Sequence, residues 1–505
     1  MESKLVQKLL PAVLRAKVYP IARETPLDYA ELLSARLGNR IYLKREDLQP
    51  VFSFKLRGAF NKIANLSSAD RERGVVAASA GNHAQGVALS AAHFGIPSTI
   101  FMPVTTPEIK VRAVSSLGGT VKLIGADFDE AARLAEEFAA TERQTYVHPF
   151  DDFDVIAGQG TVAMELARQL DGDLDAVFVC VGGGGLLAGV SGYLKSLFPG
   201  VQIIAVEPED APTFYEARKH GGPHTLQSVG RFADGVSVKR FGSLNYEIAG
   251  ACTDDCILVE HDEICAAIRD VFEETRSILE PSGALAVAGL SKWLRKNEWR
   301  DKNCIAITSG ANINFDRLRF VAERADIGSN REAIYAVTIP ERPGMFKRFI
   351  EVLGVRQITE FNYRYADPKQ AQIYVGIEVG DREQRDKVLG EIQDAGFQAV
   401  DMTDSEIAKS HLRHMVGGKS SVEIPERLFS VTFQEKLGAF REFLEGLHPD
   451  WNISLTHYRN HGGSLGRVLM GFQVSDDEAS VLDIVARLPG EWTEVTDDPF
   501  CQLFL

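Results

Sequence analysis

The sequence predicts an α/β protein with parallel sheets in two lobes over residues 1–325, followed by two smaller α+β modules. Three observations lead to this fold class. Short β-branched runs alternate with amphipathic stretches in the first part, which is typical of parallel sheets covered by helices on both faces. About 320 residues are too many for one simple sheet, which favours two lobes. The last 180 residues have a different pattern and contain an internal repeat.

The predicted strands of the first part are short and rich in Val, Ile and Ala. They lie at residues 74–79, 98–102, 120–124, 176–181, 201–206 and 303–308. Helical patterns separate them, and two examples are residues 128–141 and 160–170.

The internal repeat has an offset of 94 to 95 residues. Tyr335-Ala-Val-Thr-Ile recurs as Phe429-Ser-Val-Thr-Phe, and further matches follow downstream. Each copy reads as strand, helix, strand, strand, helix, strand, which predicts a small βαββαβ module. We expect these modules at residues 330–405 and 425–505. Modules that only extend an oligomer interface are the alternative interpretation.

The composition excludes several classes of function. Apolar residues make up 45 % and charged residues 25 %, as in globular proteins rather than disordered chains. A net charge of −15 gives no basic face for nucleic acid. Residues 176–194 are uncharged but contain four consecutive glycines, each costing about 1 kcal/mol in a helix, so we expect no membrane span.

The cysteines and the first residues predict a cytoplasmic protein. The six cysteines are scattered, and only Cys252 and Cys256 lie close together. No Cys or His pair nearby completes a zinc site, so no metal is expected. Residues 1–20 mix five charged residues with leucines and lack the apolar core of a signal peptide.

Four consecutive glycines, Gly182 to Gly185, are the strongest local signal. They follow a strand and precede an apolar helix, so their backbone N–H groups are expected to face an anion. The pattern Gly183-x-Gly185-x-x-Ala188 also fits a dinucleotide fingerprint, with Glu207 about 20 residues further on. A nicotinamide dinucleotide, a single phosphate and a purely structural turn therefore remain open for the loop alone.

Two further motifs carry chemistry. Lys55 is flanked by apolar and aromatic residues, and a lysine in an apolar pocket becomes a nucleophile able to form a Schiff base. An exposed helix lysine is the alternative. The segment Ser79-Ala-Gly-Asn-His83 follows a predicted strand at a helix start, a position that suits a carboxylate. His83 alone would more often be a packed or capping histidine.

Together these motifs resemble one family of enzymes. The order of Lys55 in Ser-Phe-Lys, the Ser79 segment, the four glycines and Thr308-Ser-Gly-Ala-Asn312 resembles the fold type II pyridoxal-phosphate enzymes. Within them, the segment from Lys44 to Ala59 and the duplicated C-terminal module resemble the biosynthetic threonine dehydratases (threonine deaminases). The resemblance covers nearly the whole chain. A nicotinamide enzyme would leave Lys55 and Ser309 unexplained.

The resemblance implies an ammonia-lyase with pyridoxal 5′-phosphate as cofactor. It would convert L-threonine to 2-oxobutanoate and ammonia by β-elimination, the first step of isoleucine biosynthesis. Lys55 would bind the cofactor and act as the base at Cα, Asn82 would bond the ring's phenolic oxygen, and Ser309 would face the pyridine nitrogen. The phosphate would be held by Gly182, Gly183, Gly184, Gly185 and Leu186. The substrate would be held by Ser79, Gly81, Asn82 and His83.

The hydroxyl of Ser309 has a chemical consequence. It cannot hold a pyridinium as an aspartate would, so the ring is a weaker electron sink and prompt loss of the β-substituent is favoured. Glu280, in Leu279-Glu-Pro-Ser-Gly-Ala284, begins a helix near the site in related enzymes. The resemblance gives it no definite role.

The repeat resembles paired ACT-like regulatory modules. The resemblance implies inhibition by isoleucine, opposition by valine, a homotetramer, and effector contacts from Tyr363, Tyr458 and Arg459. An arginine suits an amino-acid carboxylate, whereas packing is the alternative for each tyrosine. A serine dehydratase or racemase of the same family remains an alternative function. A non-catalytic amino-acid-binding regulatory protein is the alternative from another class.

Overall fold

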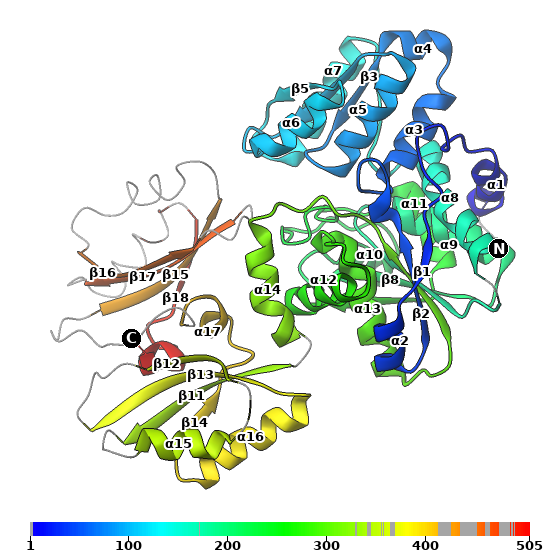
Figure 1. The fold of residues 1–505 in the computed structure, drawn as a ribbon. Helices are drawn as coiled ribbons and strands as arrows, with labels where there is room; N and C mark the ends of the chain where they lie inside the picture. The colour runs from blue at the N-terminus through cyan, green and yellow to red at the C-terminus, as the bar shows by residue number, and fades with distance from the viewer. Residues whose placement is uncertain are drawn as a thin grey trace. The chain divides into compact units, whose positions relative to one another are not determined.

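The chain folds into two compact units, Met1–Asn314 and Phe315–Leu505, and each is described by itself. A computed structural model gives the structure (Figure 1). It describes residues 4–170, 172–328, 331–340, 345–354, 356, 358–363, 369–412, 426–434, 452–459, 465–473, 485, 488 and 490–504. In this part of the chain no helix is both long and apolar enough to cross a membrane.

The first unit contains two sheets, as predicted. The large sheet has the order β1 (Leu27–Tyr29), β2 (Arg40–Arg45), β10 (Asn303–Thr308), β7 (Ala176–Cys180), β8 (Gln202–Pro208) and β9 (Asp255–Val259). Only the edge strand β1 is antiparallel to its neighbour. The small sheet is wholly parallel and has the order β5 (Thr120–Leu123), β4 (Ser98–Met102), β3 (Val75–Ala78) and β6 (Thr145–Tyr146).

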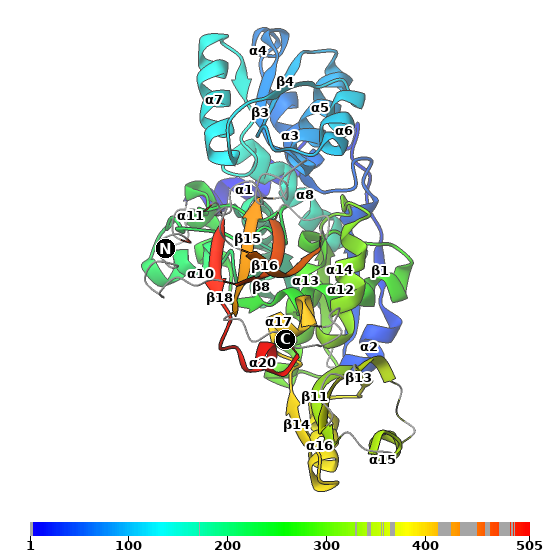
Figure 2. The ribbon, with the colours of Figure 1, turned by 90° about the vertical axis from the view of Figure 1, so that its left-hand side faces the viewer.

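Helices cover both faces of the small sheet, which explains why its central strand β3 is apolar throughout. Alternate residues of β3 point to opposite faces: Val75 and Ala77 pack under α5 (Asn82–Phe94), whereas Val76 and Ala78 pack under α7 (Phe128–Thr141). Figure 2 shows α7 on one side of β3 and β4 and α5 on the other. The remaining helices near this sheet are α3 (Lys55–Asn65), α4 (Ser68–Arg73) and α6 (Glu108–Ser116).

Longer helices surround the large sheet. They are α8 (Phe153–Gln169), α9 (Gly185–Leu197), α10 (Thr213–His220), α11 (Ser243–Cys252), α12 (His261–Thr275) and α13 (Pro281–Asn297), with α1 (Lys4–Leu14), α2 (Glu31–Leu37) and the short η1 (Glu46–Leu48). The predicted helix at 160–170 begins earlier, at Phe153, because the Asp152 side chain accepts hydrogen bonds from two N–H groups of the first turn. The predicted helix at 128–141 is α7 itself.

The second unit contains two antiparallel sheets with the same topology. The first has the order β12 (Ile358–Tyr363), β13 (Gln370–Glu378), β11 (Glu332–Pro340) and β14 (Gln398–Asp401). The second has the order β16 (Asn452–Arg459), β17 (Leu465–Gln473), β15 (Glu426–Gln434) and β18 (Glu491–Glu494). Both show a register shift at the same place, between Ile358 and Glu360 in one and between Ile453 and Leu455 in the other.

The helices of the second unit are described mainly for the first copy. There α15 (Met345–Leu353) and α16 (Arg382–Asp394) pack on the sheet over a core that includes Val337, Phe349 and Val375. The corresponding helices of the second copy, and most of the segment 405–427 between the two copies, lie outside the described residues. The described part of this unit also contains α14 (Arg317–Gly328), α17 (Glu406–Ser410) and α20 (Pro499–Phe504).

The two copies contact each other within the second unit. Glu406 of α17 accepts hydrogen bonds from Arg324 and from Arg467 of β17, and the imidazole nitrogens of His411 and His457 lie 2.8 Å apart. Phe500 of α20 packs against the core on the other face of the first sheet. The C-terminal end of the second copy is therefore built into the first.

Candidate active site

Lys55 is the first residue of α3 and is half-buried, so it is not the exposed helix lysine considered as the alternative. Its Nζ donates a hydrogen bond of 3.1 Å to the carbonyl of Gly235. Burial lowers the pKa of Lys55 below its ordinary value of 10.5, and the charges of Glu280 and Asp234 only partly oppose this. A buried amine with a lowered pKa is more readily neutral, which is the state that a nucleophile or base requires.

The glycine loop follows β7 and leads into α9. Two of its carbonyls accept hydrogen bonds from side chains outside the loop. The carbonyl of Gly182 accepts from Thr213 Oγ1 at 2.8 Å, and that of Gly183 accepts from Asn245 Nδ2 at 2.7 Å. Within the described residues, no acceptor takes the amide N–H of Gly183 or Gly184. These amides and the N-terminus of α9 form a cradle that fits a phosphate group.

Glycine is required at the two central positions of this loop, Gly183 and Gly184. A Cβ at Gly183 would overlap the ring of Phe150, and one at Gly184, where φ is +97°, would overlap the ring of Phe241. Glu207, which the dinucleotide hypothesis needs for a ribose, is fully buried and accepts from the N–H groups of Phe214 and Tyr215. The dinucleotide interpretation is therefore wrong.

The segment from Ser79 to His83 follows β3 and begins α5. The hydroxyl of Ser79 accepts from the N–H of Gly81 at 3.2 Å, and a Cβ at Gly81 would meet nothing within 4 Å. The imidazole of His83 is buried and lies 2.8 Å from the carbonyl of Val147, and burial lowers its pKa to about 3. The side chain of His83 is thus packed and neutral, and its first-turn N–H remains for an anion.

A third loop, after β10, meets the start of α5. Asn312 Nδ2 donates to Asn82 Oδ1 at 2.6 Å, and Asn82 Nδ2 donates to Glu280 Oε1 at 2.6 Å. Ser309 is buried, and its hydroxyl donates to the carbonyl of Ser282 at 3.2 Å. The structure thus joins Asn82 to Glu280 and Asn312. Asn312 belongs to the sequence motif that contains Ser309, but the sequence alone gave it no role. Its position in that motif was the only signal that could have identified it.

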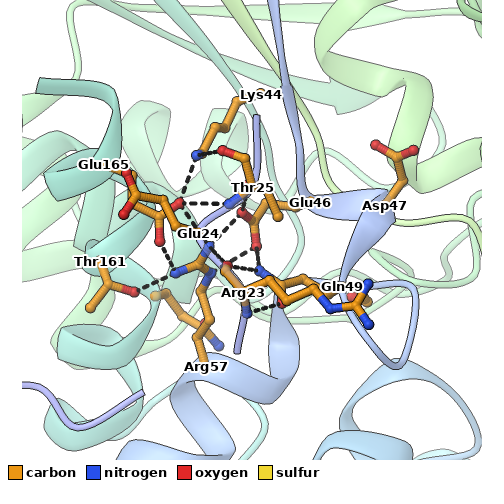
Figure 3. A network of polar contacts seen from close by, with 12 residues as sticks. Arg23, Glu24, Thr25, Lys44, Glu46, Asp47, Gln49, Arg57, Thr161 and Glu165 are labelled. Carbon is orange, nitrogen blue, oxygen red and sulfur yellow. Dashed lines mark hydrogen bonds and ion pairs between the residues drawn. The ribbon is translucent and has the colours of Figure 1, made fainter. Parts of the chain in front are cut away.

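A network of buried charges holds the first turn of α3 (Figure 3). Arg57 donates to Glu46 at 2.7 Å and to Glu165 of α8 at 2.5 Å, and Lys44 of β2 donates to Glu165 at 2.6 Å. All four side chains are fully buried. Burial acts to raise the pKa of Glu46, but the charges of Arg57 and Lys44 outweigh it and hold this pKa below 4.5. The network contains two cations and two anions, so it is neutral.

The three predicted effector residues lie at the ends of matching strands. Tyr363 is the last residue of β12 and faces Ile373 across the ladder, and Tyr458 and Arg459 are the last residues of β16. Their side chains lie outside the described residues, so effector binding stays a prediction. Within the described chain, no group of three or more His, Cys, Asp or Glu residues is arranged to hold a metal ion.

The chain is similar to known proteins over both units. Residues 18–310 match the family described as pyridoxal-phosphate dependent enzyme, and residues 323–412 and 417–505 each match the C-terminal regulatory domain of threonine dehydratase. The biosynthetic L-threonine dehydratase of Escherichia coli (strain K12) is 49 % identical over 497 residues, covering 98 % of this chain and 96 % of that protein. The chloroplastic biosynthetic threonine dehydratase of Arabidopsis thaliana is 47 % identical, covering 98 % and 84 %.

Solved structures resemble the first unit. The processed form of threonine deaminase isoform 2 from Solanum lycopersicum is 46 % identical with a TM-score of 0.63, covering 64 % of this chain and 94 % of that one. A serine racemase from Dictyostelium discoideum is 32 % identical with a TM-score of 0.56, covering 61 % and 99 %. The predicted resemblance and cofactor are confirmed: the chain belongs to the biosynthetic threonine dehydratase family of pyridoxal-phosphate enzymes.

Proposed function

We propose that this protein dehydrates and deaminates L-threonine to 2-oxobutanoate and ammonia, the first step of isoleucine biosynthesis, under end-product control. One observation carries the proposal: the amine of Lys55, whose pKa is lowered by burial, lies in the same unit as a glycine cradle and an Asn82 amide held from two sides. The names of full-length relatives support the same reaction and substrate.

The residues present fit pyridoxal 5′-phosphate. The amides from Gly182 to Leu186 would hold its phosphate, and Lys55 would bind it covalently. Asn82 would donate to its phenolic oxygen, and Ser309 would face its ring nitrogen. When bound, the cofactor supplies a carbonyl for amine exchange and a conjugated ring that accepts the electron pair from Cα.

Protein groups move and orient the substrate around this cofactor. The neutral amine of Lys55 takes the proton from the substrate Cα, and loss of the β-hydroxyl follows as the Cα–Cβ double bond forms. The hydroxyl of Ser79 and the amides of Gly81, Asn82 and His83 would hold the substrate carboxylate at the N-terminus of α5. The imidazole of His83 is a weak base, because burial lowers its pKa to about 3, and its Nε2 already lies against the carbonyl of Val147.

The second unit would carry the regulation. We place one regulatory module at 330–405 and the other at 425–505, with isoleucine and valine as effectors and Tyr363, Tyr458 and Arg459 as contacts. The shared register shift in β12 and β16 supports equivalent sites, because the residues after the shift have the same pairing register against β13 and β17 in both copies. We further propose a homotetramer in the cytoplasm, where the six free thiols stay reduced.

The test is an absorption spectrum of the purified protein before and after L-threonine, with 2-oxo acid measured in parallel. We expect a visible band that changes with threonine, release of 2-oxobutanoate, and loss of both in Lys55→Ala. Lys62→Ala is the matched control, because Lys62 lies on the same helix but pairs with Asp152. A colourless protein that gains nothing from added cofactor would contradict the proposal. So would one that releases no 2-oxo acid from L-threonine but converts L-serine to D-serine.

A further inference from the structure

Glu280 lies among the residues assigned to the cofactor, and neither the sequence motif nor the reaction above gives it a role. It is the N-cap residue of α13, yet its side chain makes no capping hydrogen bond to its own helix. Its carboxylate instead reaches Asn82, whose Nδ2 donates to it at 2.6 Å. A carboxylate that leaves its own helix N-terminus uncapped gives up a favourable local interaction.

Two glycines, Gly310 and Gly235, leave space for the Glu280 carboxylate. A Cβ at Gly310 would overlap Glu280 Oε1, and a Cβ at Gly235 would lie 3.6 Å from the same oxygen. The backbone also ties the loops together, because the N–H of Glu280 donates to the carbonyl of Gly310 at 3.2 Å. Gly235 is the residue whose carbonyl accepts from Lys55 Nζ. The carboxylate therefore lies where the Lys55, Asn82 and Ser309 loops meet.

The hydrogen bonds of Asn82 have a definite direction. Its Oδ1 accepts from Asn312, so its Nδ2 must be the atom that faces Glu280. An amide nitrogen has two N–H groups, and within the described residues no other acceptor takes the second one. Without a carboxylate at position 280, the Asn82 side chain would lose the acceptor that fixes the direction of its Nδ2.

We propose that Glu280 is a positioning residue of the reaction: its carboxylate holds the Asn82 amide so that the second N–H serves the ring oxygen of the cofactor, and its charge stabilises positive charge at Lys55 Nζ. This inference rests on the function proposed above, since it assumes the cofactor contacts of Lys55 and Asn82. An ionised acceptor strengthens the bond from Asn82, and an anion near Lys55 favours its charged form.

The ionisation of Glu280 is expected to be visible near neutral pH. Burial raises the pKa of Glu280 to about 7, and Asp234 adds to this. Asn82 on α5, Lys55 on α3 and Lys110 on α6 act in the opposite direction. The thiol of Cys180 on β7 also faces this group, and burial keeps it neutral by raising its pKa to about 11. The ionised, competent form of Glu280 therefore increases as the pH rises through about 7.

The experiment separates the orienting role from the charge. Glu280→Gln keeps an acceptor oxygen but removes the charge, whereas Glu280→Ala removes both. We expect Glu280→Gln to bind the cofactor within threefold of the wild type but to lose the titration of the visible band and of kcat/KM near pH 7. We expect at least tenfold weaker cofactor binding for Glu280→Ala. Glu207→Gln is the control, because burial raises the pKa of Glu207 to about 7 as well, but its carboxylate contacts α10.

A double-mutant cycle tests the contact itself. If Glu280 acts through Asn82, the variant Asn82→Ala/Glu280→Ala binds the cofactor within threefold of Asn82→Ala alone. Additive losses would overturn the proposal, as would a titration near pH 7 that persists in Glu280→Gln or disappears in Glu207→Gln. Activity of the wild type toward L-threonine distinguishes failure of the proposed function from failure of the role proposed for Glu280. If the wild type releases no 2-oxo acid from threonine, the proposed function fails, whereas the cofactor-binding cycle still tests Glu280.

Discussion

The neutral charge network beneath Lys55 makes a strong prediction about stability. Glu165 accepts from Arg57 at 2.5 and 3.0 Å, from Lys44 at 2.6 Å, from Tyr19 at 3.0 Å and from the N–H of Thr25 at 3.3 Å. Glu165→Gln keeps the shape but leaves two buried cations facing one anion. Breaking a buried ion pair from one side costs about 3–5 kcal/mol, so we expect a loss of this size in the free energy of unfolding.

Removing one cation as well should recover part of this loss. Lys44→Met in the Glu165→Gln background restores a net charge of zero and leaves the Arg57–Glu46 pair, with its bonds of 2.7 and 2.8 Å, intact. Replacing an entire buried pair costs far less than breaking it, so the double variant should be more stable than Glu165→Gln by about 1 kcal/mol or more.

Urea unfolding of the cofactor-free protein, followed by circular dichroism, measures the order of the midpoints. The exposed pair Arg133–Glu137 on α7 gives the control, since Arg133→Ala should cost less than about 0.5 kcal/mol. A double variant less stable than Glu165→Gln would refute the reasoning. It would show that Lys44 stabilises the fold through packing rather than through its charge.

Two further predictions concern the loops at the strand ends. Gly184→Ala should weaken cofactor binding at least tenfold, because φ is +97° and the new Cβ overlaps Phe241. Gly200→Ala is the control and should leave cofactor binding unchanged, since its new Cβ meets nothing within 4 Å. Equal cofactor affinities of the two variants in equilibrium dialysis would contradict this prediction. Burial raises the pKa of Glu207 to about 7, so the folded protein binds a proton there that the unfolded chain releases near 4.5. Its stability should therefore fall by a few kcal/mol as the pH rises from about 4.5 to 7, and urea titrations should show a shallower fall in Glu207→Gln.

Four of the strands that sequence patterning predicted are buried along nearly their whole length. β3, β4, β7 and β10 lie within predicted runs because each is buried on both faces. β2, in contrast, contains Lys44 and Arg45, which read as surface residues although both are buried. The burial of Lys44 depends on Glu165, and a local pattern cannot show a partner that lies 121 residues away.

The glycines of α8 also depend on distant partners. The sequence predicted this helix from residue 160, whereas it begins at Phe153 and contains Gly158 as well as Gly160. In the folded chain a Cβ at Gly158 would meet the backbone of Gly58 at 2.7 Å, and one at Gly160 would meet Val13 at 2.5 Å. These glycines let α8 approach its neighbours closely, and the packing offsets the roughly 1 kcal/mol by which each glycine disfavours a helix.

The candidate site shows where sequence reasoning ends. Lys55, the glycine loop and Ser309 could be named from the chain alone, because each lies in a motif of distinctive residue types. What orients them could not, since Glu280 and Asn312 lie 198 and 230 residues from Asn82. An isolated Asn82 amide can present either end to a ligand. It becomes a donor of fixed direction only when Asn312 donates to its oxygen and Glu280 accepts from its nitrogen. The chemistry of the motif therefore depends on partners that only the folded chain brings close to it.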